Sequence, residues 1–152
     1  MIRIEGCPNP SVVTIEIGGA GETGTEEVIR GIHDSLRSTS LALNEYVLPG
    51  AGSIHSRIAH AVRLASEKQS GRERLAMEAF ARAMETIPST LVENAGGEPL
   101  DRILELRSTS LEESPVGISE DGKKWVVERV WHPRSVIENS LQSATETAMG
   151  ML

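Results

Sequence analysis

Three glycines near the N-terminus have the spacing of a phosphate-binding loop. The pattern G-x-G-x-x-G is met by Gly19, Gly21 and Gly24, between a candidate strand and a helical pattern. Such a loop can bind a dinucleotide when a second parallel strand follows about 20 residues later and ends in an acidic residue. Here a long helical pattern follows instead, with Glu45 at its end. The alternative is a flexible strand-to-helix loop in which Thr23 and Glu26 form a capping box, and the missing second strand favours this alternative.

The other side chains that could do chemistry are scattered. Asp34 stands in the middle of a helical pattern over residues 26–45, where an isolated acid is usually a solvated side chain. His55 and His60 are five residues apart and do not share a helix face, so they are poor metal-ligand partners. The single cysteine, Cys7, excludes an internal disulfide and a CxxC metal pair. We therefore predict no metal site from these residues.

The composition restricts the class of protein. A chain of 152 residues fits one domain, or a domain with a small appendage, and its formal charge of −7 argues against a nucleic-acid partner. No apolar run approaches the roughly 20 residues that span a bilayer, and no basic segment followed by an apolar stretch opens the chain. We expect a cytoplasmic protein with no membrane partner. One Phe, one Tyr and two Trp leave a mostly aliphatic core.

The apolar periodicity predicts a mostly helical chain. A β-branched strand, Val12–Ile17, precedes the helix over 26–45, and Ser53 is expected to cap a second long helix. A third helix is predicted with one apolar face, made of Leu75, Ala76, Ala79, Phe80, Ala83, Met84 and Ile87. Pro88 should bend or re-cap that helix, whereas Gly96 and Gly97 stop it and Pro99 starts the next.

A small β element is predicted before the last helix. Asp121-Gly122 is a hairpin-turn dipeptide between Val116–Ile118 and Trp125–Val130, and Pro133 opens the final helix. The predicted fold is mostly α, with an N-terminal strand and a β-hairpin before the last helix. Two regions are expected, a strand and helix over 1–46 and a helical region over 47–152.

The order of short motifs along the chain resembles the C-terminal part of a group II chaperonin subunit, the archaeal thermosome family. The resemblance covers nearly the whole chain and is most specific in its middle block. It rests on EGCPNP followed by VVTIEI, RGIHDSL over residues 30–36, VLPGAG over 47–52, SGRE over 70–73, AFA over 79–81, Ile87-Pro88, ENAG over 93–96, and the tail after Pro133. The family implies an equatorial-domain-like helical bundle, preceded by an intermediate-domain-like strand and helix.

The resemblance also implies functional residues. Asp34 falls on the family's catalytic aspartate, and Gly50, Ala51 and Gly52 fall on its nucleotide-contacting turn. His132 stands where the family has an acidic residue near the nucleotide, and Ala51 replaces a glycine, where a Cβ would crowd the ligand. The Gly18-Gly19-Ala20 stretch replaces an R-G-G sequence of the family. The resemblance therefore implies that the glycine-rich loop is a diverged form of that family loop. These 152 residues contain no counterpart of the family's phosphate loop or apical domain.

Three functions follow from this comparison. The first is a truncated chaperonin relative with a chaperone-like or assembly role, no cofactor and little or no autonomous ATP turnover. The second is an ATP- and magnesium-binding subunit that needs a partner chain for the phosphate loop, and the third is a purely structural oligomerisation module. The partners expected are a second copy, full-length chaperonin or unfolded protein. Helices that lack their usual neighbours would leave apolar stripes such as Leu75–Ile87 and Ile54–Val62 partly uncovered, which predicts a homo-oligomer, with a two-fold dimer as the commonest closed form.

Overall fold

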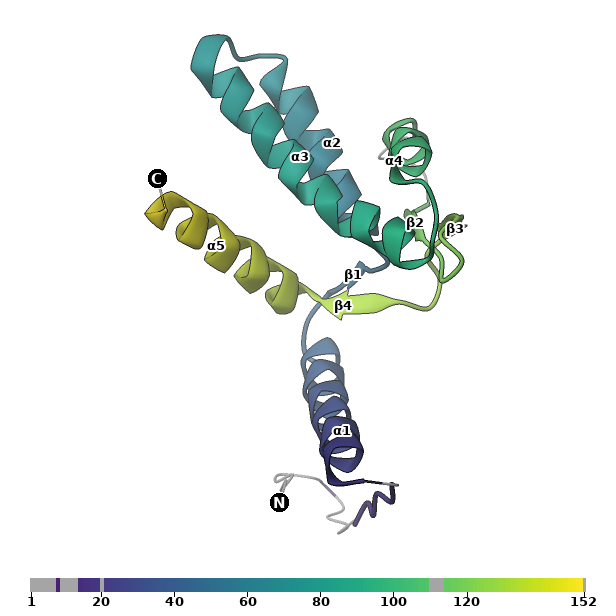
Figure 1. Ribbon diagram of the computed structural model, residues 1–152. Coiled ribbons are helices and arrows are strands. Elements are labelled where there is room, and N and C mark those ends of the chain that lie inside the picture. The colour runs from purple at the N-terminus through teal and green to yellow at the C-terminus, as the bar shows by residue number, and fades with distance from the viewer. Residues whose placement is uncertain (1–7, 9–13, 20, 110–113, 152) are drawn as a thin grey trace. The chain divides into compact units, whose positions relative to one another are not determined.

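The computed structural model of the chain describes residues 8, 14–19, 21–109 and 114–151. These residues form a mostly helical structure, as predicted, and they also contain two small antiparallel strand pairs (Figure 1). The chain divides into two compact units, Met1–Ser40 and Leu41–Leu152. None of the helices among the described residues has the length and apolar character needed to cross a membrane.

The first unit contains most of helix α1, Glu22–Ala42. The helix begins before Thr23, so the predicted Thr23–Glu26 capping box is wrong, and the carbonyl of Gly21 instead accepts bonds from the backbone N–H and the hydroxyl of Thr25. Residues 14–17 of the predicted strand form neither strand nor helix, and Val12 and Val13 lie outside the described residues. No described residue of α1 is buried, and its apolar side chains Val28 and Ile29 are about half exposed.

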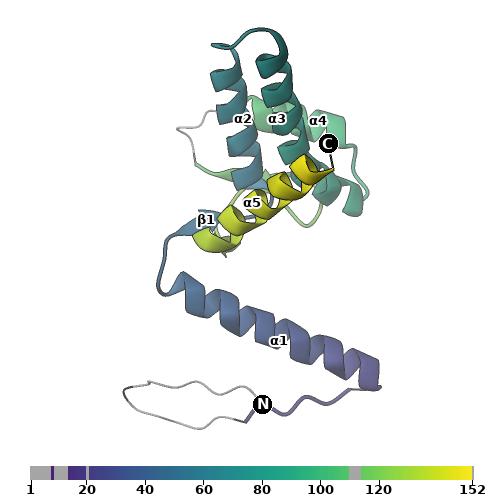
Figure 2. The same cartoon turned by 90° about the vertical axis from the view of Figure 1, so that its left-hand side faces the viewer.

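The second unit is built on an antiparallel helix pair, α2 (Ser53–Ser66) and α3 (Gly71–Asn94), which lie side by side (Figures 1 and 2). The helix α3 runs without interruption through Pro88, so the predicted alternative of a new cap there is wrong. Proline removes one helical hydrogen bond, but the ring of Pro88 is fully buried and packs against Gly52 at the start of α2. This packing explains why the helix keeps a proline in its interior.

The buried face of α3 differs from its most periodic apolar face. Its buried residues are Ala81, Glu85, Pro88 and Val92, which recur at three- and four-residue steps. The apolar face from Leu75 to Ile87 is largely open, since Leu75 is 65% exposed and Ile87 is 46% exposed. The separate expectation that the Leu75–Ile87 stripe would be partly uncovered is therefore confirmed.

Glycine ends α3 as predicted. Ala95 is the C-cap and Gly96 takes a left-handed conformation with φ of 75°. The N–H of Gly97 donates to the carbonyl of Val92 and the N–H of Gly96 to that of Glu93, both at 2.9 Å, which is a Schellman motif. Pro99 then opens α4, Pro99–Arg107.

The hairpin also forms where it was predicted. Strands β2 (Val116–Ile118) and β3 (Lys124–Val126) pair antiparallel around a turn in which Gly122 has φ of 75°. Ile118 joins three helical side chains in the buried apolar core of this unit, which consists of Val92, Ile103, Leu106 and Ile118. The hairpin thus covers one end of the α3–α4 pair.

The predicted strand Trp125–Val130 is shorter than expected, because residues 127–130 form no strand. Its first part belongs to β3, and a separate strand β4, Trp131–Pro133, pairs antiparallel with β1, Val47–Pro49. Helix α5, Arg134–Gly150, follows β4 directly with Pro133 as its N-cap. The first residues of α5 are tied back to the chain before β1, because Ser135 donates to the carboxylate of Glu45 from its N–H at 3.1 Å and from its hydroxyl at 2.6 Å.

Candidate functional site

Pairing of β1 with β4 brings together the turn residues and the histidine that the sequence had singled out. Leu48 lies opposite His132 in this ribbon, and the N–H of Gly50 donates to the carbonyl of Val130 at 2.8 Å. A Cβ placed on Gly50 would lie 3.0 Å from Nε2 of His132. Gly50, Ala51, Gly52 and His132 therefore form one cluster at the start of α2.

The turn needs glycine because the protein itself fills the space around it. A Cβ on Gly50 would lie 2.6 Å from a side-chain carbon of Val130, and one on Gly52 would lie 2.8 Å from Cβ of Pro88. Gly52 also has φ of 73°, in the left-handed region that favours glycine. Both glycines are buried. Their missing side chains thus make room for Val130 and Pro88.

Ala51 is held by the hairpin. Its φ of 52° is the only positive value among the described residues other than glycine. Its carbonyl accepts the N–H of Ile118 at 2.8 Å, and a Cβ on Gly117 would lie 2.4 Å from that carbonyl oxygen. The turn therefore serves as a junction at which β1, α2, α3, β2 and β4 converge.

Two polar atoms at the start of α2 have no hydrogen-bond partner among the described residues. They are the hydroxyl oxygen of Ser53, in a fully buried residue, and Nδ1 of His55. Ser53 is the first residue of the helix and Gly52 is its N-cap, so the predicted role of Ser53 as the cap is wrong. Burial lowers the pKa of His55, and the nearby charge of His132 lowers it further.

The remaining predicted residues lie elsewhere. Asp34 lies on α1 in the first unit with an exposed side chain, and its implied catalytic role stays a prediction. Of the glycine motif, Gly24 lies inside α1 and Gly21 directly before it, so no loop joins a described strand to this helix. Within the part of the chain that the structure describes, no three His, Cys, Asp or Glu side chains form a group that could hold a metal ion.

A second cluster, which the sequence did not predict, lies between α2, α3 and α4. The buried carboxylate of Glu85 accepts two hydrogen bonds from Arg63 on α2, at 2.5 and 2.6 Å, and two from Arg107 on α4, at 2.8 and 2.6 Å. Burial raises the pKa of Glu85, but the bonds from Arg107 and Arg63 outweigh it and bring the pKa from 4.5 down to about 2. No local pattern could have found this cluster, because each arginine is 22 residues away from Glu85.

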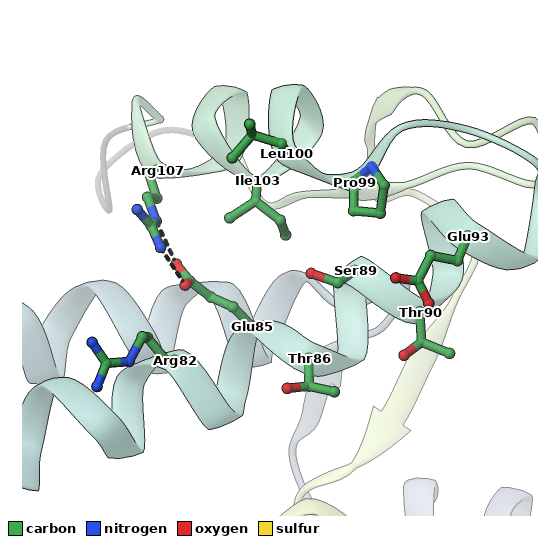
Figure 3. Close-up of a pocket in the computed structure, with 10 residues that line it drawn as sticks. All are labelled: Arg82, Glu85, Thr86, Ser89, Thr90, Glu93, Pro99, Leu100, Ile103 and Arg107. Carbon is green, nitrogen blue, oxygen red and sulfur yellow. Dashed lines mark hydrogen bonds and ion pairs between the residues drawn. The ribbon is translucent and has the colours of Figure 1, made fainter.

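A pocket of about 420 Å³ lies beside this cluster, between α3 and α4 (Figure 3). Hydroxyl and charged side chains of α3 line one part of it, and Pro99, Leu100 and Ile103 of α4 line another. Figure 3 shows Glu85 and Arg107 reaching toward each other at one end. Since Glu85 and Arg107 are already paired at that end, we interpret the pocket as part of the helix junction.

Comparison with known proteins relates the whole chain to chaperonins. The model of the TCP-1/cpn60 chaperonin family matches residues 1–152. The chain is 39% identical to the thermosome subunit beta of Archaeoglobus fulgidus, with all of this chain and 29% of that protein covered. It is 37% identical to the thermosome subunit beta of Desulfurococcus mucosus, with 97% of this chain and 31% of that protein covered. The chain thus spans under a third of the length of these relatives.

A solved structure agrees with the fold. The open-state monomer of a group II chaperonin from Methanococcoides burtonii superimposes with a TM-score of 0.64 and 29% identity, over 69% of this chain and 27% of that one. The predicted resemblance is therefore confirmed. This chain belongs to the TCP-1/cpn60 chaperonin family.

Proposed function

We propose that these 152 residues serve a chaperone-related or assembly role, with little or no ATP turnover of their own. The observation that carries the proposal is the packing of the Gly50–Gly52 turn. The spaces that its glycines leave open are taken by Val130 and Pro88, and the carbonyl of Ala51 is bound by Ile118. The family match covers the whole chain, and the chain also has a buried core around α3 and α4. Both observations support a helical scaffold as the part of the family structure that this chain provides.

The residues around the turn do not fit a magnesium–triphosphate. Magnesium at phosphate sites is usually held by one or two carboxylates together with the phosphates, whereas the residues of the Gly50–Gly52 turn have no carboxylate. The ionisable side chain beside the turn is the imidazole of His132, which is not an acidic ligand. Both features support a chain that does not turn over ATP alone.

Calorimetry with ATP and magnesium tests the nucleotide part of the proposal. We expect no binding heat with the full 152-residue chain and no phosphate release in a colorimetric assay. Hydrolysis that is lost in Asp34→Ala would overturn the proposal and favour the ATP-hydrolysing subunit. Hydrolysis that survives Asp34→Ala would indicate a contaminating enzyme, and further purification should remove that activity.

An aggregation assay tests the chaperone part. The apolar stripe of α3 is open, with Leu75 65% exposed and Ile87 46% exposed, and such surface can hold unfolded polypeptide. We expect the chain to slow the light-scattering rise of a heat-labile model enzyme, and Leu75→Ser/Ile87→Ser to lose this effect. Arg74→Ser, on the same helix within an exposed ion pair, is the matched control. No suppression by the unchanged chain would favour the purely structural module.

The same exposed stripe supports self-association. We propose a homo-oligomer, with a two-fold dimer as the simplest closed form. Sedimentation equilibrium should give a mass above the 16.4 kDa of one chain at micromolar concentration. A monodisperse monomer would contradict the assembly role while leaving the calorimetric test unaffected.

A further inference from the structure

Helix α1 has an apolar face, although no described residue of the helix is buried. Val28, Ile29, Ile32 and Leu36 lie on one side of the helix, because they recur at steps of three and four residues. Val28 is 51% exposed, Ile29 is 48% exposed and Leu36 is 38% exposed, while Ile32 is partly buried. The open face runs along about two and a half turns of the helix.

A helix of this sequence needs a partner for that face. It has 21 residues, and two of them, Gly24 and Gly31, are glycines, which are poor helix formers. Isolated helices are marginal in water, and most helical stability in proteins comes from the packing of an apolar face. The stability of α1 therefore depends on what covers its apolar side chains.

The charges beside this face are complementary to themselves. Glu26 and Arg37 are eleven residues apart, which is about three helical turns, so they lie along the same edge of the face. Neither has an ion-pair partner among the described residues, whereas Glu27 and Arg30, on the opposite side of the helix, pair with each other at 3.2 Å. The free acid stands at the N-terminal end of the face and the free base at its C-terminal end.

We propose that α1 pairs antiparallel with α1 of a second copy of the chain, around a two-fold axis beside Ile32. In this pairing Glu26 of each copy lies beside Arg37 of the other, so an ion pair flanks the apolar contact at both ends. The proposal rests on the self-association proposed above, and it adds α1 as a contact surface distinct from the open stripe of α3.

The apolar side chains fit the same register as the charges. Val28 lies four residues before Ile32 and Leu36 lies four residues after it, so Leu36 of the second copy packs against Val28. The two Ile32 side chains meet at the axis. A two-fold contact requires this reciprocity, in which each residue meets its counterpart's partner.

Other arrangements of the two helices fit less well. A parallel pair would place Glu26 beside Glu26 and Arg37 beside Arg37, where like charges repel. The antiparallel contact is small, with four apolar side chains from each copy. Since stable interfaces are usually larger, we expect a dissociation constant in the micromolar range.

Charge reversal followed by mixing tests the pairing on the full chain. Sedimentation equilibrium is run at low ionic strength, where surface ion pairs are least screened. Glu26→Arg alone and Arg37→Glu alone should each associate about tenfold more weakly than the unchanged chain, because two attractive contacts become repulsive. An equal mixture of the two variants should regain the original affinity, since the mixed pair has an arginine opposite a glutamate at both ends. Glu27→Arg and Arg30→Glu, which make the same charge changes on the opposite side of α1, are the matched controls and should associate like the unchanged chain.

The outcomes distinguish this pairing from self-association in general. A monomeric unchanged chain would overturn both proposals. Association that persists at full strength in Glu26→Arg and Arg37→Glu, or that the mixture does not restore, would overturn the α1 pair and leave self-association through another surface.

A substitution at the axis tests the apolar part of the contact. Ile32→Ser should weaken association at least tenfold, because the change acts twice in each dimer. An unchanged affinity would contradict the proposed register. None of the changed residues belongs to the second unit, so its urea unfolding midpoint should be the same in every variant and serves as the control for folding.

Discussion

Removal of the Glu85 carboxylate should destabilise the second unit more than any other single change to a charged residue among those described. Glu85 is 6% exposed and joins three helices through four hydrogen bonds to Arg63 and Arg107. In Glu85→Gln the two guanidinium groups would remain next to each other without an anion between them. We expect the variant to fold, with α4 less firmly held on α3.

The magnitude can be worked from the pKa of Glu85. A fall from 4.5 to about 2 corresponds to about 3 kcal/mol of stability at neutral pH, since each pKa unit is worth about 1.4 kcal/mol. Breaking a buried ion pair by removing one partner costs about 3–5 kcal/mol in other proteins, which agrees with this value. Urea unfolding followed by circular dichroism measures the loss, and with a slope of about 1–3 kcal/mol per molar the midpoint should fall by roughly 1–3 M.

Two controls make the experiment decisive. Glu78→Gln removes an exposed pair with Arg74 on the same helix, at 2.8 Å, and should cost about 0.5 kcal/mol or less. An acid titration of the unchanged chain should show the Glu85 contribution intact above about pH 4.5 and lost as the pH falls toward 2, because the folded pKa lies below the unfolded one. A loss of less than 1 kcal/mol in Glu85→Gln, or one no larger than in Glu78→Gln, would refute the reasoning.

The turn at the start of α2 allows further tests by the same urea assay. Gly52→Ala should cost about 2–4 kcal/mol, from left-handed backbone strain plus overlap with Pro88 at 2.8 Å, whereas Gly71→Ala, with φ of 63° and open space around it, should cost only about 1 kcal/mol. Equal losses in the two variants would argue against the overlap. Ser53→Ala should be neutral or stabilising by about 1 kcal/mol, because it deletes a buried hydroxyl without a described partner. A clear destabilisation would reveal a partner for that hydroxyl.

Features of the fold that depend on short-range chemistry could be predicted from the sequence. Only a few adjacent residues specify the end of α3 before Gly96, the start of α4 at Pro99 and the hairpin at Asp121-Gly122. The helical class followed from apolar periodicity alone. These are the elements for which local preference and tertiary structure agree.

Features that depend on distant partners were missed. A proline within a helix normally predicts a break, but the packing of Pro88 into the space beside Gly52 outweighs the lost hydrogen bond. The buried face of α3 contains a glutamate, which no apolar pattern would assign to a core, because the arginines that make its burial possible lie on other helices. The apolar face that the periodicity selected is instead the open one.

The candidate site was predicted in part. Resemblance singled out Gly50, Ala51, Gly52 and His132, and the structure brings these residues together through the β1–β4 ribbon. The role of Asp34 remains a prediction.

The bond between Glu45 and Ser135 has a consequence for the order of folding. It closes a loop of 90 residues, whereas the Ser119–Lys123 bond of the hairpin closes a loop of four. The entropy of closing the longer loop from an open chain is greater by about 3 kcal/mol, which delays the ribbon until the helices have drawn its ends together. In a stopped-flow refolding experiment on a Trp125→Phe variant, whose remaining tryptophan is Trp131 in β4, the fluorescence should therefore change after the helical circular dichroism has recovered. The ribbon that holds the candidate site is then the last part of the unit to assemble and the first to be released when the chain is stressed.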